Sequence, residues 1–355
     1  MSSTPARPEP AFRGFPVEVA RVRRLSPSFL RMTFTGADLA HFGDTGLDQR
    51  IKLVLPAGCA VPLADFSGED WFVAWRSRPA AERETLRTYT VRAVRRQSRE
   101  VDVDVVLHGV APGAVTTRGC GLADLLGCTC SAPAGPAVRW CAAARSGDPI
   151  VLVGPNARYE GPPSGIEWRP PVEATRYLLA GDETAVPAVC AILESLPAEA
   201  TGHALLEVPT AHDRLQVRAP AGVTVRWLPR EPGVGPSGPA SGALDHGTAL
   251  VAGVRAAIGP AARAGRPPSP PNASPPNASL SSSNLPATLE AREESDVLPW
   301  FVPADARAPD GWYAWVAGEA AVVRDLRRFL LREVGLDRRA VAAMGYWRAG
   351  RAEAA

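Results

Sequence analysis

Apolar and polar residues alternate along most of the first half of the chain. The alternation covers residues 15–34, 50–55, 86–94 and 100–107, and residues 147–155 form one further apolar segment. A period of two sends neighbouring side chains to opposite faces of a sheet, so one face packs inward while the other meets solvent. About five or six antiparallel strands of this kind can close into a small β-barrel. The first half of the sequence therefore predicts such a barrel.

The pattern changes in the second half. Residues 177–180 are a short, nearly all-apolar run of the kind buried in a parallel sheet, and residues 184–196 follow as a helix that stops before Pro197. Strands that alternate with helices predict an α/β domain with a mostly parallel sheet. The later strands, with 312–316 as the last clear one, and the final helix are predicted at residues 204–208, 223–228, 312–316 and 319–334.

A chain of 355 residues has room for two domains of ordinary size. We expect the β-barrel domain at residues 1–155 and the α/β domain at residues 172–355. Two stretches interrupt them and have the composition of loops, residues 111–133 and residues 259–296, the second with a Pro-Pro-Asn-Ala-Ser repeat and a run of serines. We treat both as insertions and expect the second to be disordered.

The charge balance excludes partners that act through bulk electrostatics. The 39 basic and 37 acidic residues leave a net charge of +2, so no overall field favours nucleic acid or an anionic membrane. The chain lacks a secretory leader in residues 1–16 and any apolar run long enough to cross a bilayer, so we expect a cytoplasmic monomer. Lys52 is the only lysine. A GC-rich codon bias explains the preference for arginine, but a lysine that persists against it is of interest for binding an anion.

The cysteines follow no disulfide pattern. Cys120, Cys128 and Cys130 raise the alternative of a metal or iron–sulfur site, but such sites normally need four ligands at tighter spacing. We therefore predict no metal site. The remaining cysteines, which we expect in the protein core, are Cys59, Cys141 and Cys190.

The strand predicted at residues 86–94 contains the segment Arg87-Thr88-Tyr89-Thr90. A guanidinium can bind a pyrophosphate, a phenol ring can pack on an isoalloxazine, and a threonine hydroxyl can form a hydrogen bond with its polar edge. The segment thus offers three different contacts to a flavin. The alternative is an amphipathic surface strand with exposed arginines.

Further segments of the chain carry a resemblance to a known family. They are Asp48-Gln49-Arg50-Ile51-Lys52-Leu53, Val106-Leu107-His108-Gly109, Gly135-Pro136-Ala137 with Trp140, Ala180-Gly181-Asp182-Glu183-Thr184-Ala185-Val186-Pro187, Trp315-Val316-Ala317-Gly318-Glu319 and Gly345-Tyr346-Trp347-Arg348-Ala349-Gly350. With these segments the chain resembles the siderophore-interacting proteins, the flavin-dependent ferric-siderophore reductases of the ferredoxin-reductase-like superfamily. The resemblance implies an antiparallel β-barrel that binds FAD, followed by an α/β domain that binds NAD(P)H.

The resemblance also implies residues that contact FAD. The Arg-x-Tyr-Thr segment would hold the isoalloxazine and the adjacent phosphate, a histidine and glycine would lie beside the FAD tail, and a Gly-Pro-Ala turn would bring backbone amides to the pyrophosphate. The alternative for His108 is a strand-end histidine bonded to backbone. The implied FAD-binding residues are Arg87, Tyr89, Thr90, His108, Gly109, Gly135, Pro136 and Ala137.

The second domain lacks the Gly-x-Gly-x-x-Gly fingerprint of dinucleotide folds, and residues 180–187 take its place after a buried strand. A helix N-terminus there favours an anion. Asp182 and Glu319 have the alternative of capping helices, and Trp347 with Tyr346 has the alternative of anchoring the tail in the core rather than covering the flavin. The implied cofactor residues of this domain are Asp182, Thr184, Ala185, Glu319 and Trp347.

The implied reaction needs no acid, base or nucleophile from the protein. NAD(P)H would reduce FAD, FAD would pass electrons singly to chelated Fe³⁺, and the weaker hold of hard oxygen ligands on Fe²⁺ would release the iron for use in the cell. Ferric siderophores are often anionic, so Lys52, Arg139 and Arg348 are the predicted substrate-binding residues. Two alternatives remain. One is a flavin reductase or electron-transfer subunit that serves a partner protein, and the other is a siderophore-binding protein without enzymatic activity.

Overall fold

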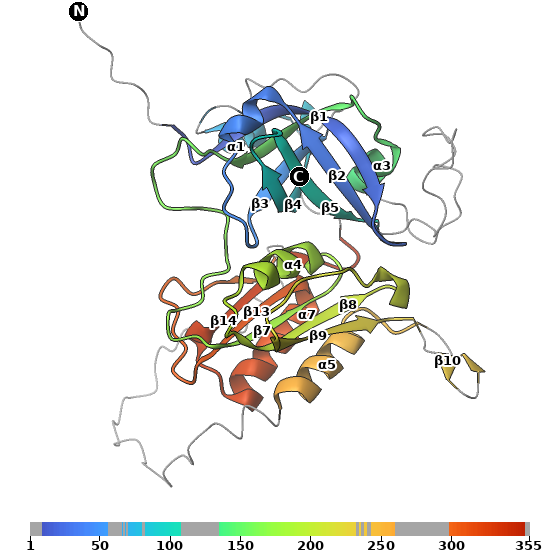
Figure 1. The fold of residues 1–355 in the computed structure, drawn as a ribbon, viewed down its shortest axis with the longest axis vertical. Helices are drawn as coiled ribbons and strands as arrows, with labels where there is room; N and C mark the ends of the chain where they lie inside the picture. The colour runs from blue at the N-terminus through green and yellow to red at the C-terminus, as the bar shows by residue number, and fades with distance from the viewer. Residues whose placement is uncertain are drawn as a thin grey trace, which may run out of the picture.

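Two bodies of secondary structure lie one above the other in the computed structural model (Figure 1). The upper body is built from the first part of the chain and the lower body from the second part. The residues that the structure describes are 9–55, 66, 68, 70–79, 82–107, 135–231, 234–235, 238–239, 243–259 and 298–351.

The upper body is a closed antiparallel barrel with the strand order β1-β2-β5-β4-β3-β6. Apolar side chains from alternate positions, among them Phe15, Met32 and Leu152, fill its interior. Among the described residues, three short helical segments flank the barrel: η1 at Ala37–His41, α1 at Trp71–Ser77 and α3 at Pro136–Ala143. The barrel strands are β1 at Phe12–Arg24, β2 at Phe29–Thr35, β3 at Arg50–Leu55, β4 at Thr85–Arg95, β5 at Glu100–Val106 and β6 at Pro149–Pro155.

The lower body contains a six-stranded sheet with the order β12-β14-β13-β7-β8-β9, in which every pairing is parallel except that of β12 with β14. The strands are β7 at Arg176–Gly181, β8 at Thr201–Val208, β9 at Gly222–Pro229, β12 at Trp300–Phe301, β13 at Trp312–Glu319 and β14 at Val341–Trp347. The fold is therefore a β-barrel followed by an α/β domain, as the sequence predicts.

Helices cover both faces of this sheet (Figure 1). Helix α4, at Val186–Ser195, packs on the face toward the barrel, and its core cluster includes Phe29 and Val106 of the barrel. Helices α5, at Thr248–Ile258, and α7, at Ala320–Phe329, pack on the opposite face. The shorter elements are η4 at Ala211–Asp213, β10 at Val234–Gly235, β11 at Gly238–Pro239, a π-helical turn η5 at Leu330–Val334 and η6 at Arg338–Ala340.

The end of the chain differs from the sequence prediction. Residues 312–316 are not the last strand, because β14 follows and pairs in parallel with β13. Its apolar residues are mostly small, Val341-Ala342-Ala343-Met344-Gly345, and all are buried, so the segment shows no alternation that would mark a strand. The helix predicted at residues 319–334 ends as a regular α-helix at Phe329 and closes with η5 before Gly335, whose φ is 82°.

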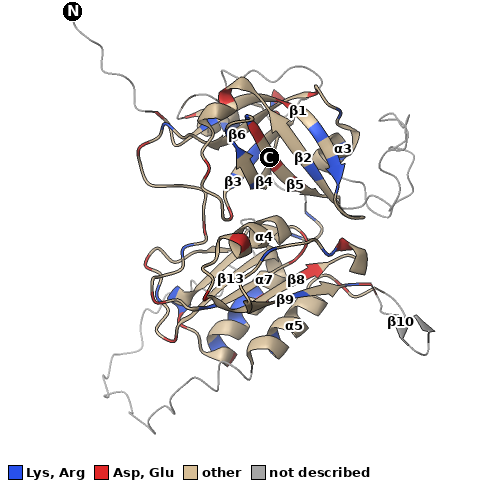
Figure 2. Cartoon of the chain, in the orientation of Figure 1, with Lys and Arg blue, Asp and Glu red and all other residues tan. Residues whose placement is uncertain are grey.

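Polar contacts hold the barrel on the α/β domain. Arg92 of β4 donates two hydrogen bonds to Glu194 of α4, at 2.9 and 2.7 Å. Asp213, which is fully buried, accepts from Ser26 Oγ at 2.7 Å, from Ser28 N at 2.7 Å and from Ser28 Oγ at 3.0 Å. Basic and acidic residues of both domains flank this junction (Figure 2). These contacts join the two domains directly.

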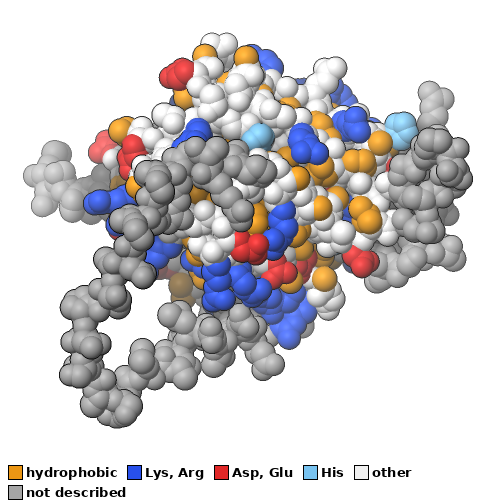
Figure 3. Space-filling model, turned by 90° about the horizontal axis from the view of Figure 1, so that it is seen from below, with side chains coloured by type: hydrophobic (Ala, Val, Ile, Leu, Met, Phe, Trp, Pro, Cys, Tyr) orange, Lys and Arg blue, Asp and Glu red, His pale blue; other side chains and the backbone are white. Residues whose placement is uncertain are grey.

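The lower face of the α/β domain presents a mixed surface. Basic side chains are grouped there beside a few acidic ones, and the apolar side chains are scattered rather than gathered in one patch (Figure 3). Among the described residues, no helix is both long and apolar enough to cross a membrane.

Candidate functional site

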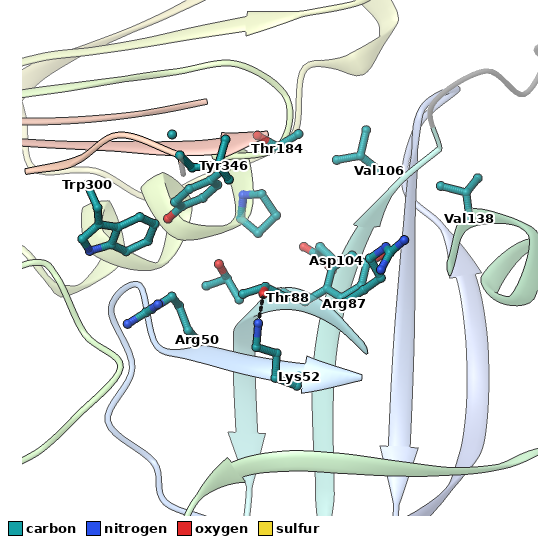
Figure 4. Close-up of a pocket in the computed structure, with 15 residues that line it drawn as sticks. Arg50, Lys52, Arg87, Thr88, Asp104, Val106, Val138, Thr184, Trp300 and Tyr346 are labelled. Atoms are coloured by element: carbon teal, nitrogen blue, oxygen red, sulfur yellow. Dashed lines mark hydrogen bonds between the residues drawn. The ribbon is translucent and has the colours of Figure 1, made fainter. Parts of the chain in front are cut away.

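A cavity of about 350 Å³ lies between the barrel and the α/β domain (Figure 4). Strands β3, β4 and β5 and helix α3 form its barrel wall, and the start of α4, the approach to β12 and the end of β14 form the opposite wall. A site enclosed by two domains, with apolar walls and a few polar groups, is typical of a cofactor site. The lining residues are Arg50, Lys52, Arg87, Thr88, Tyr89, Thr90, Asp104, Val106, Val138, Thr184, Pro187, Leu298, Trp300, Gly345 and Tyr346.

Strands β3 and β4 supply the charged wall of the cavity. The two strands pair with Lys52 opposite Thr88, and Lys52 Nζ donates to Thr88 Oγ1 at 2.6 Å. Arg87 and Tyr89 lie on either side of Thr88 along β4, and Arg87 Nη1 donates to the Leu86 carbonyl oxygen at 2.7 Å. The structure thus brings the predicted residues Arg87, Tyr89 and Lys52 to one cavity, together with Thr90.

The Gly-Pro-Ala turn lies at the start of α3. Gly135 is the N-cap, Pro136 occupies the first turn, and no side chain within the described part of the chain caps this helix end. Ala137 belongs to the barrel core, so only its backbone can contribute to a ligand, whereas Val138 lines the cavity. The predicted residues His108 and Gly109, the insertion at 111–133 and Cys59, Cys120, Cys128 and Cys130 lie outside the described residues.

Asp182 joins three strand ends at the carboxyl edge of the sheet. It follows β7 and is buried, and its carboxylate accepts from the backbone N–H of Glu319 and from Trp347 Nε1, both at 2.8 Å. Gly318, with φ 144°, lies so close that a Cβ there would be 2.5 Å from Asp182 Oδ2. Burial, together with the neighbouring charge of Glu183, raises the pKa of Asp182 to about 7.

Asp182 does not line the cavity itself, but it is hydrogen-bonded to Thr184, which does. The Thr184 hydroxyl donates to Asp182 Oδ1, and the Thr184 backbone N–H donates to the same oxygen at 2.9 Å. Thr184 lines the cavity, but Asp182 and Ala185 do not. Because its hydrogen is donated to Asp182, the Thr184 hydroxyl oxygen is left able to accept a hydrogen bond.

The helix N-termini at this edge of the sheet are not equivalent. Glu319 caps α7 through the N–H groups of Ala321 at 2.6 Å and Val322 at 3.1 Å, and it also accepts from the N–H of Ala349 at 3.2 Å. Glu207 closes the start of α5 in the same way, through Gly247 N and Leu250 N, both at 2.8 Å. Helix α4 differs in its place: it begins beside the cavity, and the carboxylate just before it, that of Asp182, accepts the N–H of Thr184 at 2.9 Å but does not line the cavity. Of these three helix N-termini, the start of α4 is the one that lies at the cavity.

The two aromatic residues of the tail separate because neighbours on a strand point to opposite faces. Tyr346 lines the cavity and lies edge-on to Trp315, with ring centroids 6.3 Å apart. Trp347 is directed to Asp182 and contacts His246, with ring centroids 5.1 Å apart. The predicted residue Trp347 therefore does not line the cavity but contacts Asp182. Its neighbour Tyr346 lines the cavity instead.

The predicted cationic residues also separate. Lys52 lines the cavity together with Arg50, a residue of the 48–53 segment that was not predicted as a site residue. Arg139 of α3 and Arg348, which follows β14, are not among the lining residues. Trp300 was missed altogether, because its two-residue strand follows the insertion at 259–296 and shows no periodic pattern.

Asp48 is a structural residue that the sequence did not reveal as such. It is buried, and its carboxylate accepts from the N–H groups of Glu167 and Trp168 and from Trp315 Nε1 of β13, all at 3.1 Å. Burial raises the pKa of Asp48 despite these hydrogen bonds. The motif at 48–53 therefore has two roles: its first residue fixes the domains together, and Arg50 and Lys52 enter the cavity.

Two protein-family models match the chain. The model of the siderophore-interacting FAD-binding domain matches residues 18–159, and the model of the siderophore-interacting protein matches residues 174–350. The chain is also 31% identical over 339 residues to the uncharacterized protein Rv2895c of Mycobacterium tuberculosis, which covers 95% of this chain and 90% of that protein. The chain belongs to the siderophore-interacting protein family.

Two further proteins are similar to the chain. The ferric vibriobactin reductase ViuB of Vibrio cholerae is 32% identical over 216 residues, which is 61% of this chain and 66% of ViuB. The crystal structure of the siderophore-interacting protein SipS from Aeromonas hydrophila has a TM-score of 0.56 and 26% identity, and covers 97% of this chain and 94% of SipS. The fold of the chain is ferredoxin-reductase-like. The family and ViuB support an oxidoreductase.

The cavity of this siderophore-interacting protein fits a flavin. Its wall offers a guanidinium, hydroxyls and aromatic rings, as a nucleotide with a flat ring system requires. Asp104 is the acidic residue of the lining, and Arg31 matches its charge through two hydrogen bonds at 2.7 and 2.8 Å. The electrostatics of the wall therefore favour a bound anion. Among the described residues, no group of three metal-ligating side chains occurs, and Cys141 and Cys190 are buried thiols whose pKa burial raises to about 12.

The buried Asp182 predicts a specific pH dependence of stability. Its pKa rises from about 3.9 in the unfolded chain to about 7 in the fold, so between these values the folded state binds the proton more tightly and acid stabilises it. The free energy of unfolding of the wild type, relative to Asp182→Asn, should fall as the pH rises through this window and then stay constant. Urea unfolding at about pH 5 and about pH 8 measures the difference. Equal differences at both pH values would contradict it.

Proposed function

We propose that the protein is an FAD-dependent reductase that uses NADH or NADPH to reduce ferric siderophores and release Fe²⁺ for use inside the cell. The observation that carries this proposal is the cavity itself. It places the Arg87 to Thr90 segment of the barrel opposite Thr184 and Tyr346 of the α/β domain. A flavin held by the first group would meet a nicotinamide and a substrate that approach from the second.

Each wall of the cavity has a role in this proposal. Arg87 binds the pyrophosphate, because a planar guanidinium suits phosphate oxygens. Tyr89 and Thr90 orient the ring system, and the Gly135 turn at α3 offers backbone amides at an uncapped helix end. When bound, FAD supplies the change from two-electron to one-electron chemistry. Tyr346 closes the opposite wall and keeps water from the ring.

The α/β domain provides for the reductant. The start of α4 beside Thr184 and Pro187 is the site proposed for the nicotinamide nucleotide, because both residues line the cavity. Thr184 accepts a hydrogen bond from the carboxamide of the nicotinamide, and Asp182 positions Thr184. Arg50 and Lys52 attract the anionic ferric chelate.

Steady-state reduction of a ferric chelate tests this function. The purified chain with FAD and NADH or NADPH should generate Fe²⁺, trapped by a ferrous-specific chromophore, faster than the same concentration of free FAD. Activity no greater than that of free flavin would refute the proposal. Rapid reduction of a ferredoxin without chelate reduction would instead favour an electron-transfer subunit.

A further inference from the structure

Asp182 is a buried carboxylate that a hydrogen bond joins to the cavity wall. Within the described part of the chain, four groups donate to it. The backbone N–H of Glu319 and Trp347 Nε1 donate to Oδ2, both at 2.8 Å, and the backbone N–H and the hydroxyl of Thr184 donate to Oδ1. Of these residues, Thr184 is the one that lines the cavity, and Figure 4 shows it on the wall formed by the α/β domain, near Tyr346.

The four donors differ in whether their hydrogen bond can be reversed. A backbone N–H and an indole N–H can only donate, whereas a hydroxyl can donate or accept. A proton added to Oδ2 of Asp182 would meet two N–H groups that cannot turn away. A proton added to Oδ1 can be donated to Thr184 Oγ1, provided that the hydroxyl hydrogen rotates away from Asp182. The hydrogen bond with the Thr184 hydroxyl is therefore the contact that can adapt to a protonated Asp182.

Asp182 titrates close to neutral pH. Burial, together with the charge of Glu183, raises its pKa to about 7. Arg230 donates to the Glu183 carboxylate at 2.6 and 2.8 Å and to Glu207 at 3.1 Å, so two carboxylates share this guanidinium. Both forms of Asp182 are therefore populated near neutral pH. The other charged or titratable groups on the elements packed around Asp182 are Glu319, Tyr346, Arg348 and His246, which contacts Trp347.

We propose that protonation of Asp182 reverses its hydrogen bond with the Thr184 hydroxyl, so that Thr184 changes from an acceptor to a donor toward the nicotinamide carboxamide. When Asp182 is ionised, the Thr184 hydroxyl donates to Oδ1, and its oxygen can accept from the carboxamide NH₂. When Asp182 is protonated, it donates to Thr184 Oγ1, and the freed hydroxyl hydrogen can be donated to the carboxamide oxygen. Asp182 is thus a positioning residue that acts through Thr184. This inference rests on the proposed function, because it assumes that the nicotinamide lies at Thr184.

A nucleotide without the amide NH₂ distinguishes the two forms of the site. In a 3-acetylpyridine dinucleotide a methyl group replaces the NH₂, so the analogue keeps the carbonyl acceptor and loses the donor. Nicotinamide itself can pair with Thr184 in either form, because its amide carries both a donor and an acceptor. The natural nucleotide should therefore keep its hydrogen bond at every pH, and the analogue should form one only when Asp182 is protonated.

Calorimetric titration of the FAD-loaded protein with oxidised nucleotides measures this preference without any electron transfer. NAD⁺ or NADP⁺, whichever binds more tightly, is compared with its 3-acetylpyridine analogue at about pH 5.5 and about pH 8.5. The ratio of the two affinities, natural nucleotide over analogue, should be about three- to tenfold larger at the higher pH, since one hydrogen bond is then lost by the analogue alone. The ratio removes the pH effects that both nucleotides share.

Three substitutions assign the effect to this pair of residues. Thr184→Val removes the hydroxyl at nearly constant volume, so the ratio should no longer change with pH, whereas Thr184→Ser should retain the change. Asp182→Asn cannot ionise, and its amide can donate to Thr184 Oγ1. The ratio of this variant should therefore be independent of pH and close to that of the wild type at about pH 5.5.

His246→Gln is the matched control. His246 is an exposed titratable residue whose ring lies 5.1 Å from that of Trp347, but it is not one of the four donors to Asp182. This variant should keep the wild-type change of the ratio with pH. A wild-type ratio that is the same at both pH values, or a change that persists in Thr184→Val, would overturn the inference.

The outcomes separate this inference from the proposed function. A protein that reduces ferric chelates with NADH or NADPH but shows a constant ratio keeps the function and loses the reversal at Thr184. A protein that shows the pH-dependent ratio but reduces no ferric chelate keeps the reversal and loses the reductase activity. A protein that binds neither nucleotide at either pH contradicts both.

Discussion

Replacing Arg87 by alanine should lower the affinity for FAD by about 10- to 100-fold. A charge-assisted hydrogen bond to a phosphate contributes about 1.5–3 kcal/mol, and alanine removes both the charge and the planar donor group. Arg87→Lys should recover part of the loss, because it restores the charge but not the paired N–H groups. The quenching of FAD fluorescence during titration of the apoprotein measures the affinity.

Arg23→Ala is the control for this substitution. Arg23 is exposed on β1 and does not line the cavity, so its removal should leave FAD binding unchanged. If Arg87→Ala binds FAD as tightly as Arg23→Ala does, the phosphates do not lie at Arg87. The Arg-x-Tyr-Thr segment would then have another role.

Asp48→Ala should cost about 3 kcal/mol or more of unfolding free energy. The substitution leaves the buried N–H donors of Glu167, Trp168 and Trp315 without their acceptor, and each unsatisfied buried donor costs about 1–3 kcal/mol. Since these donors and Asp48 belong to opposite sides of the domain junction, the cavity should also loosen and FAD should dissociate faster. Urea unfolding and the FAD dissociation rate measure the two effects.

Asp38→Ala provides the comparison for Asp48→Ala. Asp38 pairs with Arg13 at 3.1 Å, but its side chain is 44% exposed, so its loss should cost less than about 1 kcal/mol. An Asp48→Ala protein as stable as Asp38→Ala, with an unchanged FAD dissociation rate, would show that the junction does not depend on the buried carboxylate.

The barrel and the α/β order were predictable from the sequence for a physical reason. Each barrel strand turns one face to the interior of the barrel and the other face outward. Apolar and polar residues therefore alternate in its sequence, as in Val101-Asp102-Val103-Asp104 of β5. Strand β14 is buried on both faces and consists mostly of small residues, so its sequence does not alternate between apolar and polar residues. The segment was therefore mistaken for a tail. Helix α5 was not predicted either, because the residue that caps its start, Glu207, lies on β8 and is distant in the sequence.

The site was predictable where short segments carry it. The predicted residues that line the cavity are Arg87, Tyr89 and Thr90 of β4, Lys52 of β3 and Thr184 after β7. The contribution of Trp300 depends on β12 pairing with β14, and that of Asp48 depends on Trp315, which is distant in the sequence. Such long-range contacts leave no local pattern. Which of Tyr346 and Trp347 lines the cavity likewise depends on which face of β14 is turned toward the barrel.

The capping residues illustrate how one signal can have two meanings. Asp182 follows β7, Glu319 is the last residue of β13, and both precede a helix, as cofactor residues often do. In the structure Glu319 caps α7, and Asp182 positions Thr184 and joins the strand ends. Their place at the carboxyl edge of the sheet remains consistent with a role beside the cofactor, but the contact that Thr184 offers is the direct one.

Anaerobic reoxidation tests the central claim most directly. The FAD-loaded protein is reduced with one equivalent of NADH or NADPH, and a ferric tris-catecholate is then added while the flavin absorbance is followed. The account predicts that the nucleotide bleaches the flavin band, that the chelate restores it, and that a ferrous-specific chromophore captures two equivalents of Fe²⁺ for each FAD. A protein that binds no FAD, or a bound flavin that stays bleached after the chelate is added, would contradict it.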